Sequence, residues 1–421
     1  MRIIADLHLH SKYSRATSPD MDVDTLAKWG KIKGINLIGT GDFTHPAYFH
    51  ELKTKLEPTG TGLFKLKGNS SNVHFMLSVE ISNVYSQAGK LRKIHTLLFA
   101  PTFEIAEQLN QKLSKIGKLT SDGRPTFGAP LTEIAKIVFE TSPDCVMIPA
   151  HAWTPWFSIF GSNSGFDSIQ EAFGEYSKFI FAIETGLSSD PPMNWRVSAL
   201  DKVTLISNSD AHSASRLGRE ANVFECKMDY YEIMKAIKIK DKAKFLYTIE
   251  FFPEEGKYHI DGHRKCNVSL KPEETKKNKS LCPVCGRKLT VGVLSRVDDL
   301  ADRPDGYVLP DAIPYKNLIP LEEIIAEALG QSRDTKGVEK EYLRLVQQYG
   351  SEFSILLELP VSELERNAPP KVAEGVKLMR EGKVRIEPGY DGVFGKISLF
   401  GEGKKAVTVQ QQDEGQLGLF G

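Results

Sequence analysis

Residues 2–10 read RIIADLHLH, and this stretch gives the first indication of the fold. Its first half is mostly apolar, as in a buried strand, and its last three residues include two histidines. Because side chains alternate along a strand, His8 and His10 point to the same face at the strand end. Two imidazoles presented together at a strand end indicate a metal site whose other ligands must come from elsewhere in the chain.

Further apolar runs follow RIIADLHL (2–9) at regular intervals, with amphipathic helical stretches between them. The runs are residues 35–41, 73–82, 94–100, 145–151, 179–185 and 203–210. Seven strands alternating with helices predict an α/β domain with a mainly parallel sheet, closed or open. Residues 1–245 are a suitable length for a barrel of this type.

Nearly every expected strand has a histidine or carboxylate close to one end. Besides His8 and His10, these are Asp42, His45, Glu80, His95, His151, Asp210 and His212. Because the C-terminal ends of parallel barrel strands open on one face, these groups are expected to converge. Such ligands suit two or three divalent cations, with Zn²⁺ preferred and Mn²⁺, Mg²⁺ or Fe²⁺ as alternatives, and Glu80 is able to bridge two of them.

Paired cations activate water and neutralise charge on a phosphoryl group, so the set predicts phosphoester chemistry. His50, His74, His259 and Glu184 receive no role, because an isolated polar group in such a context is more often structural.

Residues 246–296 differ in composition and hold three of the five cysteines. The pattern DGHRKC followed by CPVC predicts a tetrahedral zinc site; its ligands are His263, Cys266, Cys282 and Cys285. His259 is an alternative to His263 in the first knuckle. The zinc is expected to be structural, because so small a module cannot bury enough surface to fold alone.

Residues 257–290 hold nine Lys or Arg against three Asp or Glu, although the whole chain has a net charge of zero. Without a global field, any attraction to nucleic acid must come from a local patch such as this one. We therefore favour a nucleic-acid clamp over a plain structural staple, with Lys276, Lys277 and Arg287 as candidate DNA contacts.

A helical segment over about 318–383, a glycine-rich hairpin piece and a polar tail complete the chain. The predicted units are 1–245 (barrel), 246–296 (zinc module), 297–400 (helical and hairpin region) and 401–421 (flexible tail). No apolar run approaches the roughly 18 residues of a membrane span, and the N-terminus lacks a signal-peptide pattern. A cytoplasmic location is expected.

The ordered motifs DLHLH, GTGD, SVEIS, PAHAW and SDAH resemble the PHP (polymerase and histidinol phosphatase) superfamily. The resemblance implies a distorted (β/α)7 barrel with a multi-metal phosphoesterase site. It also implies that His8, His10, Glu80 and Asp210 are core ligands completed by His95, His151 and His212, with His8, His10, Glu80, Asp210 and His212 catalytic.

Two positions depart from the superfamily pattern. Arg15 and Ala16 stand where the superfamily has Ser-Asp-Gly or a histidine, and Asp42 is followed by Phe43 instead of histidine. For a third metal, therefore, either His45 or Asp42 substitutes, or the site holds only two ions.

The order of barrel, zinc module, helical segment and PGYDGVFGKI resembles the endonuclease Q family. That resemblance implies metal-dependent hydrolysis of DNA on the 5′ side of deaminated bases (uracil, hypoxanthine, xanthine) and abasic sites, leaving 3′-hydroxyl and 5′-phosphate ends. It also implies association with the nucleoid. Two alternatives stay open: a small-molecule phosphatase, and a non-catalytic zinc-dependent DNA-binding or scaffold protein.

Recognition of a base inside a duplex requires that the base be flipped into a pocket. The stretch HAWTPWFSIFGSNSGF (151–166) follows a predicted ligand and is rich in aromatic and amide side chains. Candidate stacking faces are Trp153, Trp156 and Phe157, and Ser162 and Asn163 are candidate hydrogen-bonding groups. The alternative is an ordinary aromatic loop on the barrel rim.

The sequence QLGLF near the C-terminus resembles the pentapeptide by which bacterial proteins bind the replicative sliding clamp. Its candidate contacts are Gln416, Leu417, Leu419 and Phe420. The bacterial form fits better than the archaeal and eukaryotic form, which prefers two aromatic residues at the end. A flexible segment of this kind would become ordered on binding and bury its apolar residues.

Overall fold

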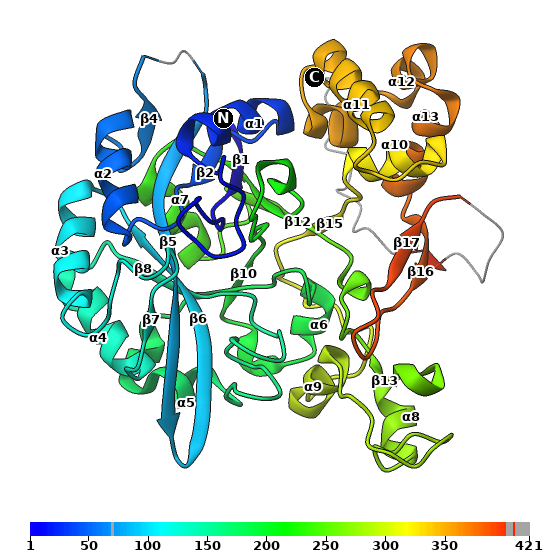
Figure 1. Cartoon of the computed structure of the whole chain (residues 1–421), viewed down its shortest axis with the longest axis horizontal. Helices are drawn as coiled ribbons and strands as arrows, with labels where there is room; N and C mark the ends of the chain where they lie inside the picture. The colour runs from blue at the N-terminus through cyan, green and yellow to red at the C-terminus, as the bar shows by residue number, and fades with distance from the viewer. Residues whose placement is uncertain (69–70, 401–406, 409–421) are drawn as a thin grey trace.

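The computed structural model describes residues 1–68, 71–400 and 407–408, and its main body is a barrel domain flanked by two smaller units (Figure 1). In the orientation of Figure 1 the barrel lies on the left, the helical segment at the upper right and the zinc module at the lower right. Over the part of the chain that is described, none of the helices has the length and apolar character needed to span a membrane.

All seven predicted strands of the barrel are confirmed. They are β1 (Arg2–Asp6), β2 (Leu37–Gly39), β5 (His74–Gln87), β6 (Lys90–Ala100), β8 (Val146–Pro149), β9 (Ala182–Glu184) and β10 (Thr204–Ile206). Strands β1, β2 and β5 pair in parallel, as do β9 and β10. The ring is joined between β1 and β10, where Leu7 N–H donates to Asn208 Oδ1 (2.9 Å) and Leu9 bridges Ala211. The predicted distorted α/β barrel is therefore confirmed.

The prediction of a mainly parallel sheet is wrong for one part of the barrel. Strand β6 runs antiparallel to both of its neighbours, β5 and β8. Two residues, Ala88 and Gly89, connect β5 to β6, and both have positive φ (50° and 74°). A two-residue turn of this kind closes an antiparallel hairpin, whereas a parallel pair needs a long crossover.

The sheet continues beyond the barrel on one side. Strand β1 also pairs with β11 (Ala221–Glu225), which pairs with β12 (Phe245–Glu250), both antiparallel. Strand β15 (Tyr315–Asn317), which follows the zinc module in sequence, pairs in parallel with β12. Three further short strands join this sheet: β3 (Leu56–Pro58), β4 (Phe64–Leu66) and β7 (Thr126–Phe127).

Helices cover the outside of the barrel. They are α1 (Val23–Lys33), α2 (Pro46–Lys55), α3 (Phe103–Leu113), α4 (Leu131–Thr141), α5 (Ile169–Phe173), α6 (Pro191–Trp195) and α7 (Tyr230–Lys238), with 3₁₀ turns η1 (Gly174–Phe179), η2 (Ser198–Leu200) and η3 (Ala214–Arg216). Their ends follow ordinary capping chemistry: the Asp22 side chain accepts from Thr25 N–H to begin α1, and Gly34 ends it in the left-handed conformation (φ 87°).

The two smaller units have the predicted character. The zinc module contains η4 (Pro253–Glu255), β13 (Asp261–His263), η5 (Arg264–Cys266), β14 (Val268–Leu270), α8 (Pro272–Lys277) and α9 (Val293–Leu300). The helical segment contains α10 (Leu321–Leu329), α11 (Lys336–Tyr349), the π-helical turn η6 (Ser354–Glu358), α12 (Val361–Asn367) and α13 (Pro370–Arg380). It leads into the predicted hairpin of β16 (Lys383–Glu387) and β17 (Lys396–Ser398), and β18 (Val407–Thr408) pairs with β16.

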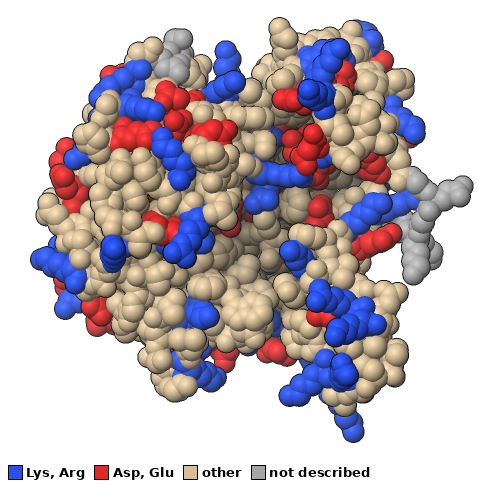
Figure 2. Space-filling view, in the orientation of Figure 1, with Lys and Arg blue, Asp and Glu red and all other residues tan. Residues whose placement is uncertain are grey.

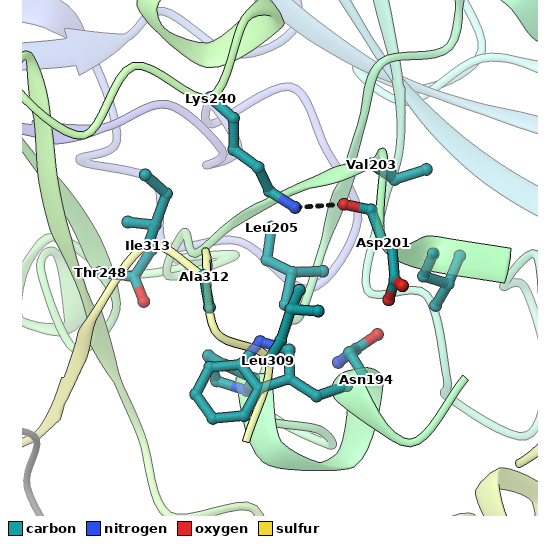
Figure 3. Close-up of a pocket in the computed structure, with 12 residues that line it drawn as sticks. Asn194, Asp201, Val203, Leu205, Lys240, Thr248, Leu309, Ala312 and Ile313 are labelled. Carbon is teal, nitrogen blue, oxygen red and sulfur yellow. Dashed lines mark hydrogen bonds between the residues drawn. The ribbon is translucent and has the colours of Figure 1, made fainter. Parts of the chain in front are cut away.

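The connection between α9 and β15 packs against the barrel and leaves a small cavity of about 20 Å³ (Figure 3). Leu205, Leu309 and Ile313 are among its lining residues, and Lys240 Nζ donates to the Asp201 carbonyl at its edge (2.6 Å). A cavity of this volume holds about one water molecule. We interpret it as a small packing defect between this connection and the barrel.

A buried ion pair joins the barrel to the helical segment. Lys33 Nζ on α1 lies 2.6 Å from Glu352 Oε2, and the two side chains are 4% and 6% exposed. The same carboxylate accepts hydrogen bonds from the Tyr342 hydroxyl (2.6 Å) and from Leu321 N–H (3.1 Å). One carboxylate therefore links α1 to the start of α10 and to α11.

Substituting Lys33→Met should destabilise the chain by about 3–5 kcal/mol, because Glu352 would remain buried without its cation. Chemical denaturation measures this change in the free energy of unfolding. The matched control is Arg366→Met, which breaks an exposed pair with Glu363 (2.9 Å, side chains 70% and 42% exposed); such a change costs less than about 1 kcal/mol. Equal effects of the two substitutions would contradict the role assigned to the buried pair.

Candidate metal centre

Loops and strands from all around the barrel bring histidines and carboxylates to one place. His8 and His10 follow β1 directly, Glu80 lies in β5, His95 in β6, and Asp210 follows β10. His151 follows β8 in the same way. Although β6 is antiparallel, its pairing with β5 puts Ser82 opposite His95, so His95 still lies close to Glu80.

The first group of potential ligands contains His8, His10, Glu80 and Asp210, whose ligand atoms all lie within 4.8 Å of one another. His10 Nε2 is 3.2 Å from Asp210 Oδ1 and 3.3 Å from Glu80 Oε2. His8 Nε2 is 3.6 Å and 3.7 Å from the same two oxygens. Two imidazole nitrogens and two carboxylate oxygens are a suitable set for a borderline divalent cation.

The second group shares Glu80 with the first. Glu80 Oε1 lies 2.8 Å from His95 Nδ1 and 2.9 Å from His151 Nε2. The two oxygens of one carboxylate therefore face two different groups, as expected for a bridging ligand. Burial is the main cause that lowers the pKa of His95 to about 4, so its ring is neutral and able to donate a lone pair.

Unpaired buried atoms test whether the first group fits a cation. In the described part of the chain, His8 Nε2, His10 Nε2 and Asp210 Oδ1 are buried without a hydrogen-bond partner. Buried polar atoms normally have partners, because leaving one unpaired costs about 1–3 kcal/mol. Three such atoms around one point are explained together by a metal ion, so these residues fit the group.

Burial and interactions between the ionisable groups act in opposite directions on the pKa values of this site. Burial by itself would raise the pKa of Glu80, but its interactions with the imidazoles of His95, His8 and His10 hold that pKa well below its usual value. Burial would lower the pKa of His8, but Glu184, Glu80 and Asp210 raise it well above. The carboxylates therefore stay ionised, and a cation that binds here displaces protons from the imidazoles.

Each of the two histidines that follow β1 contacts a carboxylate through Nδ1, the ring nitrogen that does not face the first ligand group. His8 Nδ1 is 3.0 Å from both oxygens of Glu184, and His10 Nδ1 is 3.3 Å from Asp42 Oδ1. A carboxylate in this position fixes the ring orientation and the tautomer, so that Nε2 points toward the metal. Glu184 and Asp42 thus orient the ligands of the first group.

Asp42, one of the candidates for a third metal position, lies outside both groups of ligand atoms. Its Oδ2 accepts hydrogen bonds from Ser11 N–H (2.7 Å), the Ser11 hydroxyl (2.7 Å) and the Ser14 hydroxyl (2.8 Å). With Oδ2 accepting from these donors and Oδ1 facing His10 Nδ1, the Asp42 carboxylate is placed to orient His10.

His45 and His212 lie outside both groups of ligand atoms. His45 precedes α2 and stacks on Tyr13 with ring centroids 4.5 Å apart. His212 lies 4.5 Å from the His10 ring, but its Nδ1 contacts the Asp210 carbonyl oxygen (2.9 Å). Apart from these two groups and the zinc cluster, residues 1–68, 71–400 and 407–408 contain no further group of three or more ligand residues with ligand atoms within 4.8 Å of one another.

Sequence reasoning missed two residues of this site. Glu184 received no role, yet it contacts His8 and accepts hydrogen bonds from His151 N–H (2.8 Å) and Asn208 Nδ2 (2.9 Å). Its position at the end of β9 was a usable signal. Arg124, whose Nη1 donates to Glu80 Oε2 (2.8 Å), comes from a loop, and nothing in its local sequence marks it.

The predicted zinc ligands form a cluster. His263, Cys266, Cys282 and Cys285 have ligand atoms within 4.8 Å of one another, and His263 Nδ1 is 3.4 Å from Cys285 Sγ. His259, the alternative ligand, lies outside this cluster. Burial lowers its pKa to about 4. The geometry therefore favours His263 and supports a cation at this place.

The predicted substrate-binding residues separate into three environments. Trp156, Ser162 and Asn163 line an open cavity of about 460 Å³, whose opposite wall includes Tyr258 and Thr290 of the zinc module. The prediction for Trp153 is wrong, because its side chain is 1% exposed and its indole N–H donates to Asn194 Oδ1 (2.8 Å) in the core.

Phe157 packs 4.7 Å from the His95 ring, so it supports the second ligand group and is not among the residues that line the cavity. The three basic candidates lie on the zinc module, where Figure 2 shows Lys and Arg gathered at the lower right. Lys277 and Arg287 are exposed, and Lys276 is paired with Asp298. Gln416, Leu417, Leu419 and Phe420 lie outside the described residues.

Comparisons with other proteins place the chain among known sequences. A family model described as the MJ0043 C-terminal domain matches residues 320–383. The uncharacterized protein MJ0043 of Methanocaldococcus jannaschii is 38% identical over 261 residues, which are 59% of this chain and 31% of that protein. The chain thus spans less than a third of that relative's length. The uncharacterized protein YqxK of Bacillus subtilis is 29% identical over 413 residues, covering 94% of this chain and 99% of YqxK.

Two solved structures share the architecture over almost its whole length. The lesion-specific endonuclease PfuEndoQ from Pyrococcus furiosus is 33% identical with a TM-score of 0.84, covering 94% of this chain and 95% of that one. A structure of endonuclease Q in complex with a 27-mer duplex substrate, with an abasic lesion at the active site, is 34% identical with a TM-score of 0.82; it covers 94% and 96% of the two chains.

Substituting Glu184→Gln should weaken metal binding by about 10- to 100-fold. Its partners at His8, His151 and Asn208 are all donors, so an amide nitrogen in place of one oxygen would face another donor. Calorimetric titration of the metal-free protein with Mn²⁺ or Zn²⁺ measures the change. Glu220→Gln is the matched control: Glu220 is also fully buried, and burial raises its pKa well above the usual value, so the amide replaces a neutral acid. Equal affinities in the two variants would rule out the orienting role.

Proposed function

The chain belongs to the endonuclease Q family, and from this premise we propose that it is a DNA-repair endonuclease. It hydrolyses the phosphodiester on the 5′ side of a deaminated base (uracil, hypoxanthine or xanthine) or an abasic site, leaving a 3′-hydroxyl and a 5′-phosphate. The observation that carries the proposal is the buried carboxylate of Glu80 between two ligand groups, within an architecture shared end to end with lesion-specific endonucleases.

Two sets of side chains would hold the divalent cations. His8, His10, Asp210 and Glu80 would hold one, and Glu80, His95 and His151 the other. Zinc fits this donor set well, with Mn²⁺, Mg²⁺ or Fe²⁺ as alternatives. When bound, such paired cations activate water and neutralise charge on the phosphate.

The protein's own residues prepare the site for a phosphodiester. Glu184 and Asp42 hold the rings of His8 and His10 in position. The Arg124 guanidinium reaches Glu80 from a side chain that is 28% exposed, so the same group faces both the site and the solvent. A guanidinium in this position offers a charged hydrogen bond to a phosphate oxygen as negative charge develops there.

The cavity of about 460 Å³ is the proposed pocket for the flipped base. Trp156, 47% exposed, offers a stacking face, and Ser162 and Asn163 offer hydrogen bonds to a keto group. The opposite wall belongs to the zinc module, so both domains would contact the lesion. This shared wall favours a nucleic-acid substrate over a small phosphate monoester, which would leave the zinc module without a role.

Exposed cations on the zinc module extend the proposed DNA-binding surface beyond the pocket. Lys277 and Arg287 would contact phosphates, releasing counterions, so binding should weaken as salt increases. The proposed location is the cytoplasm, at the nucleoid.

The test is a labelled duplex with a single uracil, hypoxanthine or abasic site, incubated with the protein and Zn²⁺, Mn²⁺ or Mg²⁺. We expect a nick immediately 5′ of the lesion, and a rate at least about 100-fold lower for Asp210→Asn, which removes a ligand charge. Arg366→Met serves as the unaffected control. Hydrolysis of a phosphate monoester without nicking would favour a phosphatase, and DNA binding without any turnover would favour a scaffold protein.

We further propose that Gln416, Leu417, Leu419 and Phe420 bind a sliding clamp of the bacterial type. The support is the sequence alone, because short apolar anchors next to a polar tail suit a segment that becomes ordered on binding. Deleting residues 415–421 should abolish clamp binding, measured by surface plasmon resonance, and leave nicking of naked duplex DNA unchanged. A variant that loses both properties would refute this proposal.

A further inference from the structure

A phenylalanine projects from the turn between β16 and β17. Phe394 is 69% exposed and the adjacent Val393 is 39% exposed, so both present apolar surface to solvent. We propose that Phe394 is a wedge, meaning a side chain that enters the base stack of duplex DNA beside the nucleotide that has been flipped out. This inference rests on the proposed function and adds the group that would keep the duplex open.

The turn that holds Phe394 is fixed to the zinc module by side-chain contacts. Asp391 Oδ2 accepts a hydrogen bond from Arg264 N–H (2.7 Å), and Asp391 Oδ1 accepts one from the Thr290 hydroxyl (2.5 Å). Gly392 N–H donates to the Lys257 carbonyl (2.9 Å). An exposed aromatic ring is thus presented from an anchored turn.

Close backbone packing fixes both sides of the same turn. Gly389 N–H donates to the Glu254 carbonyl (2.8 Å), and Gly395 N–H donates to the Glu255 carbonyl (3.1 Å). A Cβ at Gly395 would lie 2.0 Å from the Glu254 carbonyl oxygen, so no larger residue fits there. The turn therefore packs directly on η4.

The wedge is next to the proposed base pocket, because the two share residues. Thr290 lines the cavity and also donates to Asp391 in the turn. Tyr258 lines the cavity too, and its hydroxyl is 3.8 Å from the position that a Cβ of Gly392 would take. In Figure 1 the turn of the β16–β17 hairpin lies at the boundary between the barrel and the zinc module.

The surroundings of Phe394 favour nucleic acid as the partner. Lys257 Nζ lies 4.4 Å from the centre of the ring, and Lys257, Arg264 and Lys265 are all exposed. An aromatic side chain among cations can stack on bases while its neighbours contact phosphates. A protein partner would be expected to require a broader apolar patch than one phenylalanine and one valine.

A wedge would stabilise the flipped state. Flipping a nucleotide leaves a gap in the base stack, and this gap favours return of the nucleotide to the duplex. Filling the gap with an aromatic ring replaces part of the lost stacking. The benefit exists only where the lesion is paired and stacked beforehand. The wedge should therefore matter for a lesion in intact duplex and be dispensable for a lesion that is already unpaired.

The experiment compares Phe394→Ala with the unaltered protein on two substrates, uracil within a fully paired duplex and uracil within an unpaired bubble. We expect cleavage of the paired substrate to fall about 10- to 100-fold, the range that loss of base stacking predicts, and cleavage of the bubble to change by less than about threefold. Phe394→Leu should lie between the two. Val284→Ala is the matched control, because Val284 is 69% exposed on the zinc module and should have no effect on either substrate.

A second readout does not depend on cleavage. With 2-aminopurine beside the uracil, binding of the Asp210→Asn variant should raise the fluorescence through unstacking, and adding Phe394→Ala should remove most of that rise. Equal zinc content and thermal stability of the Phe394 variants show that the module remains folded.

Three results for Phe394→Ala would overturn the wedge. The first two are unchanged cleavage of the paired duplex and equal losses of cleavage on both substrates. The third is loss of clamp binding with DNA cleavage intact, which would identify Phe394 as a protein-docking residue. If the unaltered protein nicks neither substrate, the proposed nuclease function fails, and the 2-aminopurine signal still decides whether Phe394 enters the stack.

Discussion

The buried carboxylate of Glu80 is the constraint on which the site depends. It lies among five imidazole and carboxylate groups at the barrel's centre, where an ionised carboxylate is tolerated only when positive charge is close. Several elements contribute groups that can carry positive charge: two histidines follow β1, one follows β8, and a loop supplies Arg124. The barrel's irregular strand pairing is compatible with this convergence, since the β5–β6 hairpin keeps His95 beside Glu80.

The amino-acid sequence was sufficient to predict the seven strands and the residues of both ligand groups. Apolar runs and polar strand ends are local patterns, and His8, Glu80 and Asp210 are visible in them. The direction of a strand depends on the connection that precedes it. The two-residue turn at Ala88 and Gly89, which makes β6 antiparallel to β5, was not recognised in the sequence. The sequence alone could not separate metal ligands from residues that orient ligands, such as Asp42 and Glu184, because the two kinds have the same chemistry and differ only in which atoms surround them.

Local sequence also could not show which aromatic residues of the stretch 151–166 line a cavity and which lie in the core. Trp153 and Trp156 are three residues apart in the sequence, yet one is in the core and the other lines an open cavity. Tyr258 and Thr290 form the other wall of that cavity, more than a hundred residues later in the chain. A pocket built from two domains has no continuous sequence signature, whereas the zinc cluster has one because closely spaced knuckles supply its ligands.

Strand β15 pairs with β12 on the edge of the barrel sheet, and the zinc module lies between these two strands in the sequence. The module is therefore an insertion whose two ends are both attached to one edge of the sheet. A domain joined by a single linker has only one such attachment. The position of the module relative to the metal groups is therefore set through two connections, one at β12 and one at β15. Any change in that position has to be accommodated at both connections.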